Sequence, residues 1–299
     1  MRLFNAGIYT SNFDKLGTVY ARLTDDERAK RDSCENFLES YHYIKSQRYV
    51  DKIKRDGVKV FLDSGAFSAF SLGEVIDIGR YCDYIHRNQD IIEFPSVLDA
   101  IGDHVGTYWN QTEMERRGIR PLPCFHYGEP LEVLDHYVAN YEFITIGGMV
   151  PISTPQLKIW LDRVWDEHLT HPDGTPKVKV HGFGLTSLPL MFRYPWYSVD
   201  SSTWVQWAAN GMILIPGKAG QVDVSNKSSR RKQRGQHLDS VAPIETAAIE
   251  AEIRSFGGDP DRLRDLYYSR WAWNAWAFPT YAIKEHGVAK FTTREQRLF

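Results

Sequence analysis

The chain is poor in cysteine, which limits how it is stabilised and what it binds. Its three cysteines, Cys34, Cys82 and Cys124, lie far apart among 299 residues. They form no Cys-x-x-Cys pair and no Cys/His cluster, so we expect neither a zinc knuckle nor a disulfide framework. An odd number of isolated cysteines is typical of a reducing compartment.

The sequence also lacks a long apolar run and an excess of charge of one sign. No stretch of 18 apolar residues occurs, and the apolar part of residues 1–6 is too short for a signal peptide. We therefore expect a cytoplasmic protein without a membrane span. The formal net charge is −2, so a local basic patch would have to bind any polyanionic partner.

Short apolar runs recur between amphipathic segments, and we count eight of them as strands. Eight strands that alternate with helices are typical of a (β/α)8 TIM-like barrel, which takes about 250 residues. We predict an α/β protein in which residues 1–216 form this barrel as the catalytic core. An open doubly wound sheet is the alternative, but residues 7–10 lack its glycine-rich first turn. The predicted strands are 3–8, 58–62, 94–98, 122–125, 143–146, 178–181, 196–199 and 212–215.

Local signals predict several helix ends. The sequence Thr24-Asp25-Asp26-Glu27 is typical of a capping box, and Gly57 should end a helix over 45–56. Thr154-Pro155 should begin another helix that runs to about residue 168.

The pattern changes after residue 216. We expect residues 217–299 to form a basic loop and two helices, 243–256 and 260–277, packed on the barrel within a single domain. The loop carries five basic residues and no acidic residue between 227 and 234. It is therefore either a solvated surface loop or a binding site for nucleic-acid phosphates. These residues are Lys227, Arg230, Arg231, Lys232 and Arg234. Trp271, Trp273 and Trp276 should pack in the core, with stacking on bases as the alternative.

Ionisable or glycine residues follow most of the predicted strands directly. Each has a structural alternative, such as a helix N-cap, a buried imidazole or a tight turn. Together they indicate an active site, because the carboxyl ends of barrel strands face one cleft. The residues are Asp63, Asp99, His126, Gly147, Gly148, His181 and Asp200.

The order of these motifs resembles the tRNA-guanine transglycosylase superfamily over residues 1–216. Asp63-Ser64-Gly65-Ala66-Phe67 is similar to that family's Asp-Ser-Gly-Gly-aromatic motif. The Gly-Gly turn at 147–148 and the segment 181–184 are similar to its Gly-Gly and His-x-x-Gly stretches. Asp200 falls where the family keeps its nucleophilic aspartate.

The chain departs from the tRNA enzymes in ways that favour one branch. It lacks their Cys-x-Cys-x-x-Cys zinc site, Ala66 replaces a glycine and Ser68 replaces a glutamine. In this it is more similar to the phage-encoded DpdA branch, whose members exchange guanine for a 7-deazaguanine base in DNA. The resemblance therefore implies a pentosyltransferase that acts in the host cytoplasm on DNA and a free 7-deazaguanine base. It implies no cofactor and no metal.

The resemblance also implies a role for each site residue. Asp200 would attack the sugar, and Asp63 would give a proton to the leaving base and later take one from the incoming base. Asp99 would accept hydrogen bonds from guanine N–H groups. The backbone N–H groups of Gly147 and Gly148 would hold the guanine carbonyl.

The remaining members of the expected base site are two histidines and an aromatic ring. His126 would add a polar contact, and His181 belongs to the same expected site. Phe67 would stack on the base. A base inside a duplex would have to be flipped out to reach them.

Three other functions remain open at this point. The chain could exchange the base in tRNA, hydrolyse a glycosidic bond with the same paired acids, or bind nucleic acid without catalysis through its basic loop alone.

Overall fold

The computed structural model describes residues 1–216, 221–285 and 288–293, and the chain forms two compact units. The first unit contains residues 1–11, 36–201 and the described part of 286–299. The second contains residues 12–35 and most of 202–285. The chain thus leaves the first unit after Ser11, returns to it at Asn36 and leaves it again after Ser201. None of the helices in the described ranges has the length and apolar character to cross a membrane.

The first unit is built on one parallel sheet of eight strands in the order β4-β3-β2-β1-β8-β7-β6-β5. This is the cyclic order of a TIM-like barrel read from β4 round to β5, and the sheet is curled accordingly. A single parallel bridge, Ser96 to Leu122, joins the segments beside β4 and β5. The strands are β1 (Arg2–Ala6), β2 (Phe37–Ser40), β3 (Val60–Asp63), β4 (Ile92–Pro95), β5 (Cys124–His126), β6 (Phe143–Gly147), β7 (Lys179–Gly182) and β8 (Ser198–Ser201).

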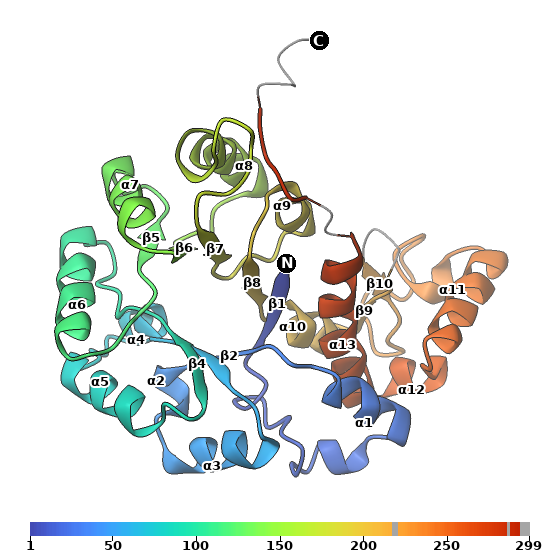
Figure 1. Ribbon diagram of the computed structural model, residues 1–299. Coiled ribbons are helices and arrows are strands. Elements are labelled where there is room, and N and C mark those ends of the chain that lie inside the picture. Colours follow the sequence, from blue (N-terminus) through green and yellow to red (C-terminus); the bar gives the residue numbers. More distant parts are fainter. Residues whose placement is uncertain (217–220, 286–287, 294–299) are drawn as a thin grey trace. The chain divides into compact units, whose positions relative to one another are not determined.

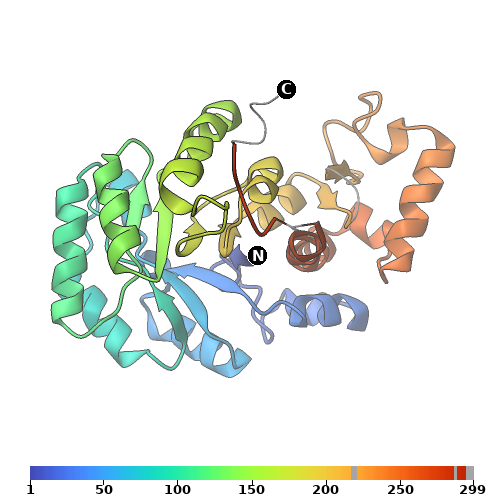
Figure 2. The ribbon, with the colours of Figure 1, turned by 45° about the horizontal axis from the view of Figure 1, so that its top comes forward.

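Helices alternate with these strands, as expected for an α/β fold. Helices α5, α6 and α7 lie side by side on the outer face of the sheet (Figure 1; Figure 2). The predicted cap at Gly57 is confirmed, because this residue ends α3 in the left-handed conformation. The helices are α2 (Tyr41–Ile44), α3 (Gln47–Asp56), α4 (Ala66–Ser71), α5 (Ile78–Arg87), α6 (His104–Arg116), α7 (Leu131–Asn140), α8 (Thr154–Arg163) with its π-helical extension (Val164–Leu169), and α9 (Leu188–Arg193).

One predicted barrel strand is wrong. Residues 212–215 do not join the parallel sheet: β9 (Met212–Leu214) pairs antiparallel with β10 (Gln221–Asp223) in the second unit. The sheet reaches eight strands through β2 instead, which lies between β1 and β3 and was missed because Glu39 interrupts its short apolar run. Glu39 is buried and accepts a hydrogen bond from the backbone N–H of Tyr9 at 2.6 Å. Burial raises the pKa of Glu39 to about 8.

Aromatic side chains fill the interior of the curled sheet. Phe4 and Phe61 meet edge to face, with their ring centroids 5.5 Å apart, and pack with Leu38 in one buried cluster. Phe183 packs against the same cluster. This apolar layer is a rigid base for the side chains at the carboxyl ends of the strands.

The second unit is mainly helical. Helix α13 packs on α1, α10 and β9, and the buried amide of Asn274 accepts a hydrogen bond from Leu214 N and donates to Met212 O. Trp273 is buried, which confirms its predicted place in a core. The predicted helix over 260–277 is two helices that meet at Leu266. The helices are α1 (Asp25–Asp32), α10 (Thr203–Ala209), α11 (Pro243–Ser255), α12 (Pro260–Asp265) and α13 (Tyr267–Glu285).

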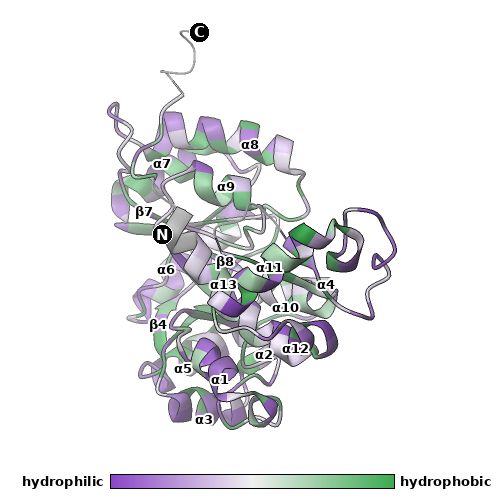
Figure 3. Ribbon diagram, turned by 90° about the vertical axis from the view of Figure 1, so that its right-hand side faces the viewer, coloured by the Kyte–Doolittle hydropathy of each residue, from purple (hydrophilic) through white to green (hydrophobic). Residues whose placement is uncertain are grey.

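Helix α1 shows how a strongly hydrophilic segment is held in place (Figure 3). The predicted capping box is present, since the Thr24 side chain accepts from Glu27 N and the Glu27 carboxylate accepts from Thr24 N. Glu27 also pairs with Arg262 at 2.8 Å and accepts a hydrogen bond from the Ser269 hydroxyl. One carboxylate therefore caps its own helix and ties it to α12 and α13.

Candidate active site

A cavity of about 680 Å³ opens at the carboxyl ends of the strands of the first unit. Its walls combine acidic, imidazole and glycine residues with apolar side chains such as Leu38 and Phe183. Seven of the residues predicted from the sequence line it: Asp63, Phe67, Asp99, His126, Gly147, Gly148 and Asp200. They come from segments spread over the chain, which is the arrangement expected of an active site on a parallel barrel.

Asp63 is the last residue of β3, and its carboxyl has a raised pKa. Burial raises its pKa to about 7, and the neighbouring carboxylates of Asp99 and Asp200 act in the same direction. The backbone N–H of Gly65 donates to Asp63 Oδ2 at 3.1 Å. At neutral pH this carboxyl therefore divides between the protonated and ionised forms, which suits a group that gives and takes a proton.

Gly65 is required by the backbone that follows this acid. Its φ is +75°, and a Cβ there would lie 2.2 Å from Ser40 Oγ and 2.5 Å from His42 Cβ. Only glycine fits this close approach. The turn lets α4 start immediately after β3, so Phe67 stands at the mouth of the cavity with 62% of its surface exposed.

Asp200 lies in β8 and is held by two donors on one of its oxygens. Gly184 N donates to Asp200 Oδ1 at 2.8 Å, and His181 Nε2 lies 3.3 Å from the same oxygen. Oδ2 receives no hydrogen bond from the residues that the structure describes. The carboxylate is mostly buried and fixed in orientation.

His181 does not line the cavity. Its side chain is fully buried behind Asp200, and its Nδ1 lies 2.9 Å from the Ser198 hydroxyl. Burial lowers the pKa of His181 even though Asp200 acts in the opposite direction, so the ring is neutral. With the Ser198 hydroxyl donating to Nδ1, the hydrogen of Nε2 points at Asp200.

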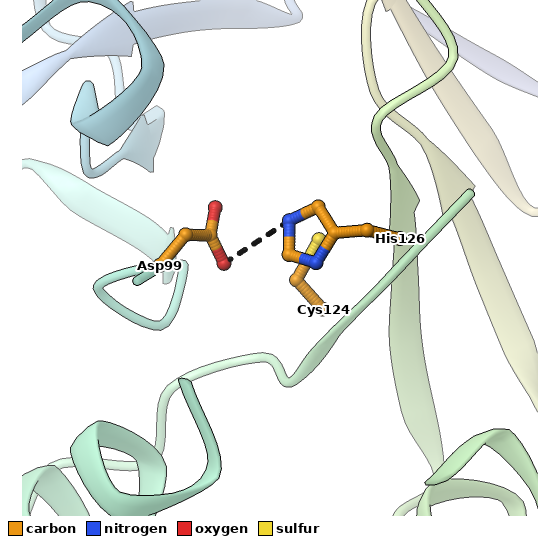
Figure 4. A group of neighbouring side chains, drawn as sticks. All are labelled: Asp99, Cys124 and His126. Carbon is orange, nitrogen blue, oxygen red and sulfur yellow. Dashed lines mark ion pairs between the residues drawn. The ribbon is translucent and has the colours of Figure 1, made fainter. Parts of the chain in front are cut away.

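His126 is clamped between two carboxylates. Its Nδ1 lies 2.9 Å from Glu129 Oε1, and Glu129 Oε2 accepts a hydrogen bond from the His126 backbone N–H at 3.0 Å. Its Nε2 faces Asp99 Oδ1 at 3.5 Å (Figure 4). Burial alone would lower the pKa of His126, but Cys124, Asp99 and Glu129 together raise it.

Gly147 leaves the space that this cluster needs. It pairs with His126 across β5 and β6, and a Cβ at Gly147 would lie 3.0 Å from Cys124 Sγ and 3.1 Å from His126 Cδ2. A side chain there would also narrow the cavity. The absence of a side chain therefore keeps the backbone of β6 open to whatever the cavity binds.

Sequence reasoning missed two members of this site, Cys124 and Glu129. Cys124 is one strand period before His126, so both side chains point to the same face of β5. Burial raises the pKa of the Cys124 thiol. The sequence signal is a Cys-x-His spacing followed three residues later by Glu129. It is easily missed because it is shorter than the Cys-x-x-Cys pairs and Cys/His clusters that are typical of metal sites.

The predicted basic stretch belongs to the second unit. Arg231 is paired with Asp239 at 2.8 Å, and the loop is braced by the Ser228 hydroxyl, which donates to Asp223 Oδ2 at 2.6 Å. The other four basic side chains are exposed and have no ion pair within the described part of the chain. They are Lys227, Arg230, Lys232 and Arg234.

Comparisons with known proteins do not assign the chain to a family. No protein-family model matches the chain, and no curated protein sequence matches it.

Proposed function

We propose that the chain is a guanine transglycosylase that exchanges guanine for a 7-deazaguanine base in DNA. The observation that carries this proposal is the pair of acids in one cavity with different environments. Asp63 holds a proton near neutral pH, whereas Asp200 is fixed through one oxygen and presents the other. Breaking and remaking a glycosidic bond needs one acid of each kind.

In the first half of the reaction Asp200 Oδ2 attacks C1′ of the sugar and the bond from C1′ to the base breaks. The electron pair of that bond goes to the base, which takes a proton from Asp63. The products are a sugar ester on Asp200, free guanine and an ionised Asp63. In the second half the incoming base gives its proton to Asp63, attacks C1′ and releases Asp200.

The buried residues behind Asp200, His181 and Ser198, support this division of roles. A neutral His181 that donates to Oδ1 keeps the carboxylate in one rotamer without neutralising it. Gly184 N donates to the same oxygen. We assign His181 as a positioning residue for the nucleophile, in place of the base contact expected from the sequence.

The opposite wall of the cavity supplies groups for a flat polar base. Asp99 would accept from N–H groups of guanine, His126 would donate to a ring acceptor, and the backbone of Gly147 and Gly148 would face the guanine carbonyl. Phe67, exposed at the mouth, would stack on the ring, which contributes about 1–3 kcal/mol per base.

Two further parts of the proposal concern the frame and the polymer. We infer that the curled sheet is a complete (β/α)8 barrel, which the bridge from Ser96 to Leu122 supports. The four exposed basic residues of the second unit would contact DNA phosphates. This is favoured because none of them is paired with an acidic side chain in the described part of the chain.

Base exchange is the test that separates this proposal from its alternatives. Radiolabelled guanine should enter duplex or single-stranded DNA in the presence of the chain, and Asp200→Asn should abolish the incorporation. Incorporation into tRNA alone would assign the enzyme to tRNA. Release of guanine without re-incorporation would identify a hydrolase, and binding without either would identify a non-catalytic protein.

A further inference from the structure

Three metal-ligating side chains of different type meet in the cavity wall. One carboxylate oxygen of Asp99, Sγ of Cys124 and a ring nitrogen of His126 all lie within 4.8 Å of one another. Figure 4 shows the three side chains converging from the segment after β4 and from β5. Carboxylate, thiolate and imidazole are the three ligand types that Zn²⁺ uses in proteins.

The surroundings orient these groups as a ligand set. Glu129 holds His126 by Nδ1, which leaves Nε2 facing Asp99. A carboxylate on the far nitrogen of a histidine is the usual outer partner of a metal-bound imidazole, because it fixes the tautomer and makes the ring more basic.

One carboxylate oxygen of Asp99 has no hydrogen-bond donor among the described residues. This oxygen, Oδ1, is buried and faces His126 Nε2 at 3.5 Å. A buried carboxylate oxygen without a donor is costly, and a cation would satisfy it. In addition, Gly147 leaves the side of the cluster that faces the cavity without a side chain.

We propose that Asp99, Cys124 and His126 bind one thiophilic divalent cation, with Zn²⁺ as the type ion, and that the cavity supplies the fourth ligand position. Zinc bonds of about 2.0–2.3 Å place tetrahedral ligand atoms about 3–4 Å apart, so the cluster needs only small side-chain rotations to close on the ion. Binding releases the proton of the thiol and the proton on Nε2.

The proposed base exchange does not require this site, but the site shares Asp99 and His126 with the proposed base site. A bound cation and a bound guanine would therefore exclude each other. The sequence signal is the Cys-x-His spacing on one strand, and no feature of the proposed reaction requires it.

Co²⁺ titration of the purified full chain tests the site without any substrate. A cysteine ligand gives an intense sulfur-to-cobalt charge-transfer band, which should saturate at one Co²⁺ per chain and disappear when Zn²⁺ is added. Cys124→Ser should remove the band, and Cys82→Ser, a buried cysteine of α5 outside the cluster, should retain it.

Glu129→Gln keeps the three ligands and serves as the second variant if Cys124→Ser fails to fold. It should weaken Co²⁺ binding about 10–100-fold while the band persists at saturation. The absence of a charge-transfer band in the wild-type chain would overturn the proposal. A band that survives Cys124→Ser, or an unchanged affinity in Glu129→Gln, would do so as well. Because no arm measures base exchange, failure here leaves the proposed reaction intact, and the reverse also holds.

Discussion

The raised pKa of Asp63 should make the stability of the protein depend on pH, and Asp63→Asn should remove that dependence. The pKa rises from 3.8 to about 7 on folding, so between these values the folded chain keeps a proton that the unfolded chain has lost. Ionised Asp63 therefore destabilises the fold fully above pH 7, and this penalty vanishes below about pH 4. Three pKa units correspond to about 4 kcal/mol, which is the upper limit of the effect.

Asparagine can accept the hydrogen bond from Gly65 N and carries no charge. We expect Asp63→Asn to stabilise the protein by about 2–4 kcal/mol at pH 8.5 and to change its stability little at pH 4. Urea unfolding followed by tryptophan fluorescence at both pH values measures the difference. Asp83→Asn, which removes an exposed carboxyl on α5, is the matched control and should have a small effect that is equal at the two pH values.

An equal change in stability at both pH values for Asp63→Asn would refute the reasoning, and so would a larger gain at low pH. The same pKa also determines in which direction the activity changes with pH. Because the first half of the proposed reaction needs protonated Asp63, kcat/KM for DNA should fall as the pH rises above about 7.

Three further predictions concern the nucleophile, the base and the polymer. His181→Gln should lower kcat by about 10–100-fold with little change in KM for the base, because it loosens the nucleophile rather than the base contacts. Phe67→Ala should weaken base binding by about 1–3 kcal/mol, measured by calorimetry with free guanine. The triple variant Arg230→Ala, Lys232→Ala and Arg234→Ala should reduce the slope of log K against log salt for DNA by up to about 3.

The chain offers a matched control for two of these. Phe70 is on the same helix as Phe67 and is equally exposed, but it does not line the cavity, so Phe70→Ala should leave guanine binding unchanged. Arg231 is paired with Asp239, so Arg231→Ala should change the salt slope less than loss of an unpaired neighbour does. Equal effects of variant and control would contradict the assignment in each case.

The positions of the site residues followed from the sequence because strand ends are marked locally. An apolar run that stops at an acid, an imidazole or a glycine places that residue at the edge of the sheet, and six such residues lie around one cavity. The environment of each side chain did not follow. In the sequence His181 follows an apolar run in the same way as the other predicted site residues. In the structure, however, it is fully buried behind Asp200 and does not line the cavity.

The fold was harder to predict where tertiary contacts override local preference. The segment 212–215 is as apolar as any barrel strand, and only its pairing with β10 shows that it belongs to the second unit. Conversely, β2 carries Glu39, an acid that argues against burial from the sequence alone. In the fold, burial raises its pKa to about 8 and Tyr9 N donates a hydrogen bond to it. The hydrogen bond from Tyr9 to Glu39 spans 30 residues of sequence, whereas residues 212–214 pair with the nearby β10 instead of joining the parallel sheet. A local apolar pattern predicts a strand but does not show which partner that strand takes.

The most direct test of the account is to identify the atom that holds the sugar during exchange. The chain would be mixed with a guanine-containing oligodeoxynucleotide without an incoming base, denatured and digested, and its DNA-linked peptide would be sequenced by mass spectrometry. The account predicts an adduct on Asp200 that Asp200→Asn does not form. An adduct on another residue, or one that persists in Asp200→Asn, would contradict it.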